Sequence, residues 1–83
     1  MGKKLIGLCV PAAQMYFDIL APDDLRIHAL TQLLTRGAAE LSEGRLVPTE
    51  MEVLCLRRPD MLLHPDRTLA DYGVEDGAQL VLI

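Results

Sequence analysis

The 83-residue chain has few aromatic side chains and no surplus of positive charge, and each shortage argues against a class of protein. It contains no tryptophan, one phenylalanine and two tyrosines, so its core must be built from aliphatic side chains. The formal net charge is −4, whereas a nucleic-acid-binding protein normally has a basic surplus that displaces counterions from phosphates. The same sign disfavours attraction to an anionic membrane surface. We therefore expect no nucleic-acid partner.

The chain also lacks an apolar run long enough to cross a bilayer. Its longest uncharged run, residues 5–17, contains Gly7 and Pro11 and is shorter than the roughly 20 residues that a spanning helix needs. The run has the composition of a strand and no convincing small-residue cleavage site of a secretory signal. We expect a cytoplasmic protein with no direct membrane insertion.

Residues suited to catalysis or metal binding are scarce. Ser42 is the only serine and has no G-x-S-x-G elbow, and the chain has no glycine-rich phosphate loop. No pair among the cysteines and histidines has the spacing of metal ligands; these residues are Cys9, Cys55, His28 and His64. We interpret both cysteines as reduced core residues and His28 as solvent-facing. The sequence predicts no enzyme, no cofactor and no metal site.

The composition that remains is that of one small globular domain covering residues 1–83. Apolar residues make up 51% of the chain and charged residues 24%, a balance that supports a packed core rather than disorder. Two apolar runs, residues 5–10 and 15–20, are joined by a short turn that begins at Pro11, which predicts an antiparallel hairpin. In the second run Phe17 and Ile19 face one way and Asp18 the other.

A single amphipathic helix is expected after this hairpin. Asp23 and Asp24 are candidates to cap its first turn, because a carboxylate there accepts hydrogen bonds from free backbone N–H groups. The apolar stripe of the helix repeats at intervals of three and four residues and consists of Ile27, Leu30, Leu34, Ala38 and Leu41. The helix is expected to end at residues 42–44, where Gly44 suits the left-handed capping conformation.

The second half of the chain predicts three more strands, at residues 51–56, 61–63 and 79–83. A turn at residues 57–60 separates the first two, and Asp76 and Gly77 give the turn before the last. Thr68 and Asp71 have the spacing of a capping box around a single helical turn.

Together these elements predict an α+β fold. One helix that buries a single stripe must pack on one face of a sheet, which gives two layers. We predict a β-grasp (ubiquitin-like) roll, with a four- to five-stranded mixed sheet packed on one α-helix.

The stretch at residues 63–77, LHPDRTLADYGVEDG, resembles a known family. It is similar to the segment of ubiquitin in which a Thr-Leu-x-Asp-Tyr run makes a short capped turn. It resembles more closely the YukD/EsaB family of small ubiquitin-fold proteins, which has the pattern Leu-x-Pro-Asp-x-Thr-Leu-x-x-x-Gly-Val-x-Asp-Gly. The run from Phe17 to Ile19 is similar to that family's aromatic-Asp-aliphatic signature. The resemblance implies that Tyr72 turns its hydroxyl back onto the preceding loop, and it implies core positions at Ile27, Leu30, Leu34 and Leu56.

That family is associated with bacterial type VII (ESX/WXG100) secretion, so the resemblance implies a non-catalytic interaction or accessory protein. Its partners would be membrane components of the secretion machinery, which would recruit it to the inner face of the membrane. Ubiquitin-type modifiers and sulfur carriers react through a C-terminal Gly-Gly, whereas residues 80–83 are apolar and contain no glycine, so we expect no conjugation. Two alternatives stay open: a modifier or sulfur carrier from a longer chain, and a regulatory binding domain of an unrelated pathway.

Arg57 and Arg58 are the candidate protein-interaction residues. By rough alignment, Arg57 falls at the centre of the surface that ubiquitin uses for its partners, and arginine is enriched in interfaces. The alternative is that both are solvated arginines in a turn. Docking is expected through an exposed sheet face or a strand edge, and a homodimer through a strand edge stays open.

Overall fold

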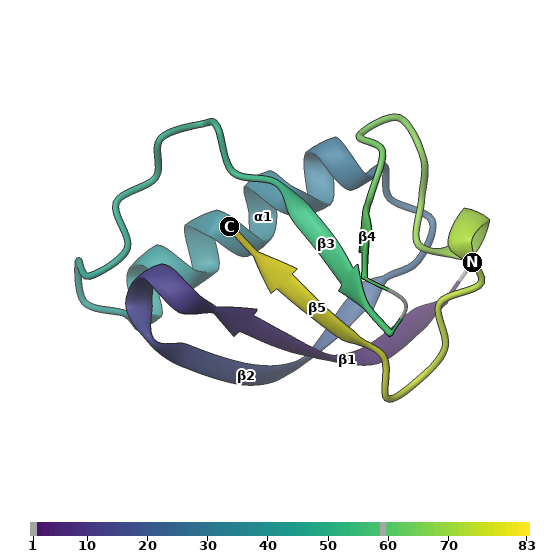
Figure 1. The fold of residues 1–83 in the computed structure, drawn as a ribbon, viewed down its shortest axis with the longest axis horizontal. Helices are drawn as coiled ribbons and strands as arrows, with labels where there is room; N and C mark the ends of the chain where they lie inside the picture. Colours follow the sequence, from purple (N-terminus) through teal and green to yellow (C-terminus); the bar gives the residue numbers. More distant parts are fainter. Residues whose placement is uncertain (1, 59) are drawn as a thin grey trace.

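The computed structural model describes residues 2–58 and 60–83 and contains one helix packed on one face of a five-stranded sheet (Figure 1). The elements are β1 (Lys3–Val10), β2 (Met15–Pro22), α1 (Ile27–Leu41), β3 (Leu54–Arg57), β4 (Met61–Leu62) and β5 (Gln79–Leu82), with 3₁₀ turns at Pro11–Ala13 and Ala70–Tyr72. The strand order is β2-β1-β5-β3-β4. The β1–β5 pair is parallel and the other three pairs are antiparallel. This arrangement confirms the predicted α+β β-grasp roll.

The hairpin of β1 and β2 is longer at its open end than the apolar runs predicted. Its register extends from Val10 opposite Met15 to Lys3 opposite Pro22. The added pairs include two lysines, because ladder hydrogen bonds join backbone groups and need no apolar side chain. At the closed end, Gln14 donates its backbone N–H to the Pro11 carbonyl at 3.0 Å.

The core lies between the helix and the sheet and is aliphatic, as expected. Its fully buried side chains come from β1, α1, β3, the 3₁₀ turn region and β5; among them are Ile6, Leu8, Ile27, Leu30, Leu54, Leu69, Leu80 and Leu82. Leu34 and Leu56, which the resemblance placed in the core, are half-buried and pack against it. Each fully buried leucine or isoleucine stabilises the fold by about 1.5–3 kcal/mol relative to exposure.

The expected aspartate cap of α1 is wrong. Arg26 is the N-cap residue, and no side chain accepts a hydrogen bond there. The first-turn donors bond instead to a distant loop: Ile27 N–H donates to the Arg67 carbonyl at 2.7 Å, and the next N–H to the Pro65 carbonyl at 2.9 Å. Asp23 is buried and accepts the backbone N–H of Gly2 at 2.9 Å.

The buried stripe of α1 also differs from the prediction at two kinds of position. Leu41, the last residue of the helix, is 62% exposed. Thr31 and Thr35 are buried, four and eight residues after Ile27, and so fall on the same helix face. The C-terminal end matches the prediction, since α1 ends at Leu41 and Gly44 has a φ of +92°.

The strands of the second half are shorter than predicted. β3 begins at Leu54, not at residue 51, and Met51 is 81% exposed because the segment before β3 leaves the sheet. Arg57 belongs to β3 and not to a turn, while Arg58 follows it with a φ of +59°. The predicted turn at residues 57–60 includes Pro59, which lies outside the described residues.

Beyond β5, backbone pairing continues for one residue. Ile83 donates its N–H to the Val53 carbonyl, and Val53 donates to the Ile83 carbonyl, each at 3.0 Å. The predicted strand at residues 79–83 is therefore paired over its whole length.

The motif that carries the family resemblance stabilises a turn. Thr68 N–H donates to Asp71 Oδ2 at 3.0 Å, and Asp71 N–H donates to Thr68 Oγ1 at 3.1 Å, which confirms the capping box. Tyr72 accepts the backbone N–H of His64 at 2.9 Å, as the resemblance implied. This segment thus has a structural role.

The single α-helix of the described ranges, 2–58 and 60–83, is too short and too polar to traverse a lipid bilayer.

Candidate functional site

The sheet face opposite α1, here called the outer face, is left uncovered by the helix (Figure 1). Side chains alternate along a strand, so the neighbours of the buried residues point to this face. Its members are Leu5, Gly7, Cys9, Tyr16, Asp18, Leu20, Cys55, Arg57, Leu62, Gln79 and Val81. An antiparallel sheet exposed on one side normally presents polar residues there. Here much of the face is apolar.

An apolar row crosses the outer face from one edge of the sheet to the other. In strand order β2-β1-β5-β3-β4, it consists of Tyr16, Cys9, Val81, Cys55 and Leu62. Tyr16 is 54% exposed and Leu62 63%, while the three between them are half-buried. A shallow hollow of about 560 Å³ lies over the part of the row from Cys9 to Leu62 and extends to Ile83. Contiguous exposed apolar surface of this kind typically marks an interaction site.

A polar row runs beside the apolar row, one pair of residues further along the strands. In the order β2-β1-β5-β3 it consists of Asp18, Gly7, Gln79 and Arg57. Its acidic and basic ends are three strand spacings apart, roughly 14 Å. A Cβ on Gly7 would overlap the Tyr16 hydroxyl oxygen and lie 2.8 Å from Cζ, so the Tyr16 ring leans across Gly7. The polar row therefore has opposite charges at its ends, and the Tyr16 ring covers its centre at Gly7.

The two predicted interaction residues are separated by this geometry. Arg57 is exposed and ends the polar row, opposite Gln79 of β5. Arg58 is exposed in the turn after β3 and does not belong to either row. Their role in binding stays a prediction.

Both cysteines are free, as expected, but they are half-buried on the outer face and not in the core. Along β2 the side chains alternate between the two faces, so Asp18 points away from the side that Phe17 and Ile19 face. The same alternation puts Tyr16 on the face of Asp18, which could have been predicted. The row itself depends on which strands are neighbours, and residue spacing does not give that. Sequence reasoning therefore missed the apolar row as a candidate site.

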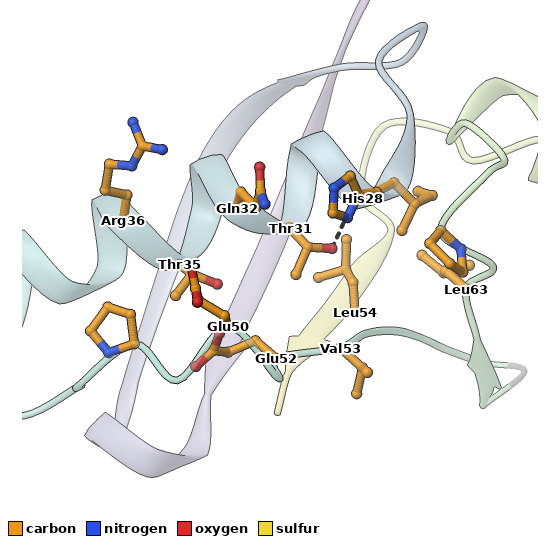
Figure 2. Close-up of a pocket in the computed structure, with 13 residues that line it drawn as sticks. His28, Thr31, Gln32, Thr35, Arg36, Glu50, Glu52, Val53, Leu54 and Leu63 are labelled. Atoms are coloured by element: carbon orange, nitrogen blue, oxygen red, sulfur yellow. Dashed lines mark hydrogen bonds between the residues drawn. The ribbon is translucent and has the colours of Figure 1, made fainter.

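A second hollow lies on the other side of the sheet, between α1 and the segment that leads into β3 (Figure 2). It has a volume of about 340 Å³. Thr31 and Thr35 point from the helix toward this hollow, and Glu50 and Glu52 approach it from the other wall (Figure 2). The Thr31 hydroxyl donates to the Ile27 carbonyl at 2.7 Å.

Thr35 differs from Thr31 in its hydrogen bonding. Its side chain is only 4% exposed, and among the described residues its hydroxyl has no hydrogen-bond partner. A buried hydroxyl without a partner costs stability. The Thr35 hydroxyl therefore lowers the stability of the fold at the second hollow.

The acidic wall of the second hollow is held by local hydrogen bonds. Thr49 donates its N–H and its hydroxyl to Glu52 Oε2, at 2.7 and 2.9 Å. Desolvation raises the pKa of Glu52, but the hydrogen bonds from Thr49 outweigh it and lower the pKa below its ordinary value of 4.5. Glu52 is thus ionised at neutral pH, and its Oε2 is already hydrogen-bonded to Thr49.

The two histidines, His28 and His64, lie on different segments, α1 and the loop after β4. His28 is exposed on α1, as predicted, and the Nδ1 of His64 accepts the backbone N–H of Asp66 at 3.1 Å. Across residues 2–58 and 60–83, no three side chains of His, Cys, Asp or Glu lie close enough together to hold a metal ion.

No protein-family model matches this chain, and no curated protein matches its sequence. Solved structures do match its fold. The ubiquitin-like domain of the type VII secretion system protein EccD1 of Mycobacterium tuberculosis has a TM-score of 0.76 and 18% identity, over 100% of this chain and 99% of that one. The EccD5 ubiquitin-like domain of Mycobacterium xenopi has a TM-score of 0.78 and 20% identity, over 100% and 94%.

A chain of the MycP5-free ESX-5 inner membrane complex also matches, with a TM-score of 0.78 and 19% identity. All of this chain is covered, but only 21% of that one. At these identities the likeness shows the fold alone: the protein has a ubiquitin-like fold of the kind seen in EccD domains. The YukD/EsaB assignment stays a prediction.

Proposed function

We propose that this protein is a non-catalytic, ubiquitin-fold interaction protein that serves a bacterial type VII secretion system. The observation that carries this proposal is the apolar row on the outer face, since exposed apolar surface bordered by charged residues is suited to protein–protein contact.

The fold supports the choice of pathway. The EccD1 and EccD5 ubiquitin-like domains share this fold along nearly their entire length, and a matching segment occurs in an ESX-5 inner membrane complex. We therefore propose a protein component of that type of machinery as the partner, met at the cytoplasmic side of the membrane. The YukD/EsaB-like motif at residues 63–77 favours an accessory protein of this kind.

We place the docking surface on the apolar row, with Arg57 at its border. Val81 lies in the middle of the row on the central strand β5. A partner that buries Val81 would displace water from the half-buried centre of the row, where contact energy is concentrated. Arg57 would then orient the partner through a hydrogen bond or ion pair at the rim.

Affinity capture from the native cells tests this proposal. Tagged wild-type protein is recovered from detergent-solubilised membranes, and co-purified proteins are identified by mass spectrometry. Type VII membrane subunits should be recovered with the wild type and lost with Val81→Lys, because a charge then sits in the middle of the row. The lysine stem can lie along the apolar surface, so the fold should tolerate this change.

Leu33→Lys is the matched control, since Leu33 is exposed on α1, away from the outer face. It should recover the same subunits as the wild type. Repeated recovery of proteins from other pathways, with none from the secretion machinery, would show that the pathway is wrong. Equal recovery with Val81→Lys would show that the surface is wrong.

A further inference from the structure

We propose that the outer face binds a second copy of this chain, so that the protein forms a two-fold symmetric, face-to-face dimer. This inference goes beyond the proposed function: a second copy and a secretion subunit would use the same surface, so the two complexes would compete for it. Its basis is the order of charges in the polar row, with Asp18 on β2 at one end and Arg57 on β3 at the other. A surface with this order can be complementary to itself.

The symmetry operation follows from the strand order. Consider a two-fold axis that is parallel to the strands and lies over the boundary between β1 and β5. It places β1 opposite β5 of the second copy, and β2 opposite β3. Two packed sheets lie about 10 Å apart, a separation that long side chains can span. Asp18 then faces Arg57 of the second copy, and Arg57 faces Asp18 of the second copy.

The same operation also matches the apolar row. Cys9 comes to lie opposite Val81 of the second copy, and the backbone position of Tyr16 opposite Cys55 of the second copy, because these residues share one row across the strands. The Tyr16 ring itself leans across Gly7 of β1. Apolar groups therefore cover apolar groups while the charged ends pair. The strand-parallel axis therefore gives favourable contacts in both the apolar row and the polar row.

The other in-plane axis, perpendicular to the strands, fails this test. When it passes over the polar row, it places Asp18 over Asp18 of the second copy and Arg57 over Arg57. Like charges facing each other oppose association. The charge order thus selects the strand-parallel axis.

The size of the face sets the strength of the dimer. Tyr16 and Leu62 are more than half exposed, and the centre of the row is half-buried. These few side chains offer less apolar surface than the roughly 800 Å² per partner that a standard stable complex buries. We therefore expect a weak dimer, with a Kd on the order of 1–100 μM.

Sedimentation equilibrium of the full chain measures this Kd at concentrations from about a tenth to ten times the expected range. Arg57→Glu should raise the Kd at least about tenfold, because the new carboxylate faces Asp18 of the second copy. Asp18→Arg should raise it by a similar factor. The double variant restores opposite charges, so its Kd should return to within about threefold of the wild type.

Two features separate specific pairing from net charge. Asp18→Arg makes the net charge of each copy less negative than −4, so a general charge effect would strengthen the dimer, whereas the pairing weakens it. Arg36→Glu is the matched control for Arg57→Glu: it makes the same charge change on an exposed helix position. Its Kd should stay within about twofold of the wild type.

A wild-type protein that stays monomeric throughout the concentration range would overturn the inference. A dimer that is indifferent to all three charge variants would overturn it as well, since association would then use another surface, such as a strand edge. If the protein is monomeric while Val81→Lys still loses the secretion subunits, the dimer is wrong and the proposed function stands. If the charge-swapped pair restores the dimer while no secretion subunit is recovered, the proposed function is wrong and the dimer stands.

Discussion

Replacing Thr35 by valine should make the protein more stable. The Thr35 side chain is 4% exposed, and its hydroxyl has no partner among the described residues. Burying such a hydroxyl costs about 1–3 kcal/mol, and valine has the same branched shape without the polar atom. Valine and threonine also have similar helix propensities, so the helix itself changes little. We expect the free energy of unfolding to rise by about 1–2 kcal/mol.

Thermal unfolding followed by circular dichroism measures this effect. For a domain of this size, 1 kcal/mol changes Tm by about 4–8 °C, so Thr35→Val should raise Tm by roughly 4–16 °C. Thr31→Val is the matched control, one turn earlier on the same face. The Thr31 hydroxyl donates to the Ile27 carbonyl at 2.7 Å, and losing this bond should lower the free energy of unfolding by about 0.5–1.5 kcal/mol.

The pair of variants isolates the hydroxyl. Both replace a buried threonine on the same helix face, so the gain from the added methyl group and the change in propensity are shared. Equal losses of stability in the two variants would refute the reasoning, because Thr35 would then have a partner as good as that of Thr31.

Three further changes probe contacts on other parts of the fold. Gly7→Ala should displace the Tyr16 ring from its place over residue 7, because the new methyl group would overlap the ring. The free energy of unfolding should change by less than about 1 kcal/mol, since the end of an exposed side chain can move. Persistence of the contact between residue 7 and the ring in nuclear Overhauser spectra would contradict this. Tyr72→Phe removes the acceptor of a backbone N–H and should lower the free energy of unfolding by about 0.5–1 kcal/mol in urea titrations, and an unchanged midpoint would show that the contact is not needed. Glu52→Gln weakens the bonds from Thr49 and should cost about 0.5–1 kcal/mol at pH 7. Because the pKa of Glu52 is lowered in the fold, its stabilisation is present above the ordinary value of 4.5 and is lost as pH falls through the folded value. The free energies of unfolding of the wild type and Glu52→Gln should therefore converge in acid. A pH-independent difference would rule out the ionised carboxylate as the cause.

The parts of the fold that depend on neighbouring residues could be predicted from the sequence. The hairpin turn at Pro11 and the capping box of Thr68 and Asp71 are made by residues within a few positions of each other, and both are present. The start of α1 could not be predicted in this way. Its first N–H groups bond to carbonyls some 40 residues later in the chain, in the loop that contains Arg67.

The stripe of α1 shows a second limit. Threonine counts as polar in a hydropathy pattern, yet its methyl group packs and its hydroxyl can bond to the preceding helical turn, so Thr31 is buried. Leu41 is apolar and fits the repeat, yet it is 62% exposed at the last position of the helix. Burial depends on what the helix covers, and the pattern does not contain this information.

The candidate site shows the same limit more strongly. Arg57 could be singled out from the sequence, but the apolar row beside it joins residues of five strands. Alternation within a strand tells which side chains share a face. Only the register between strands tells that Val81 lies between Cys9 and Cys55.

The position of β5 has a consequence for how the protein is made in the cell. β5 is the only strand that joins the β1–β2 hairpin to the β3–β4 pair, and it comes after both of them in the chain. A ribosome therefore has to release the chain as far as Leu82 before the sheet can become continuous. Until then the two halves have no strand between them, and their aliphatic side chains are available to chaperones. Folding of this domain should therefore be an all-or-none event that waits for β5 to emerge, and codon changes before β5 should alter its timing very little.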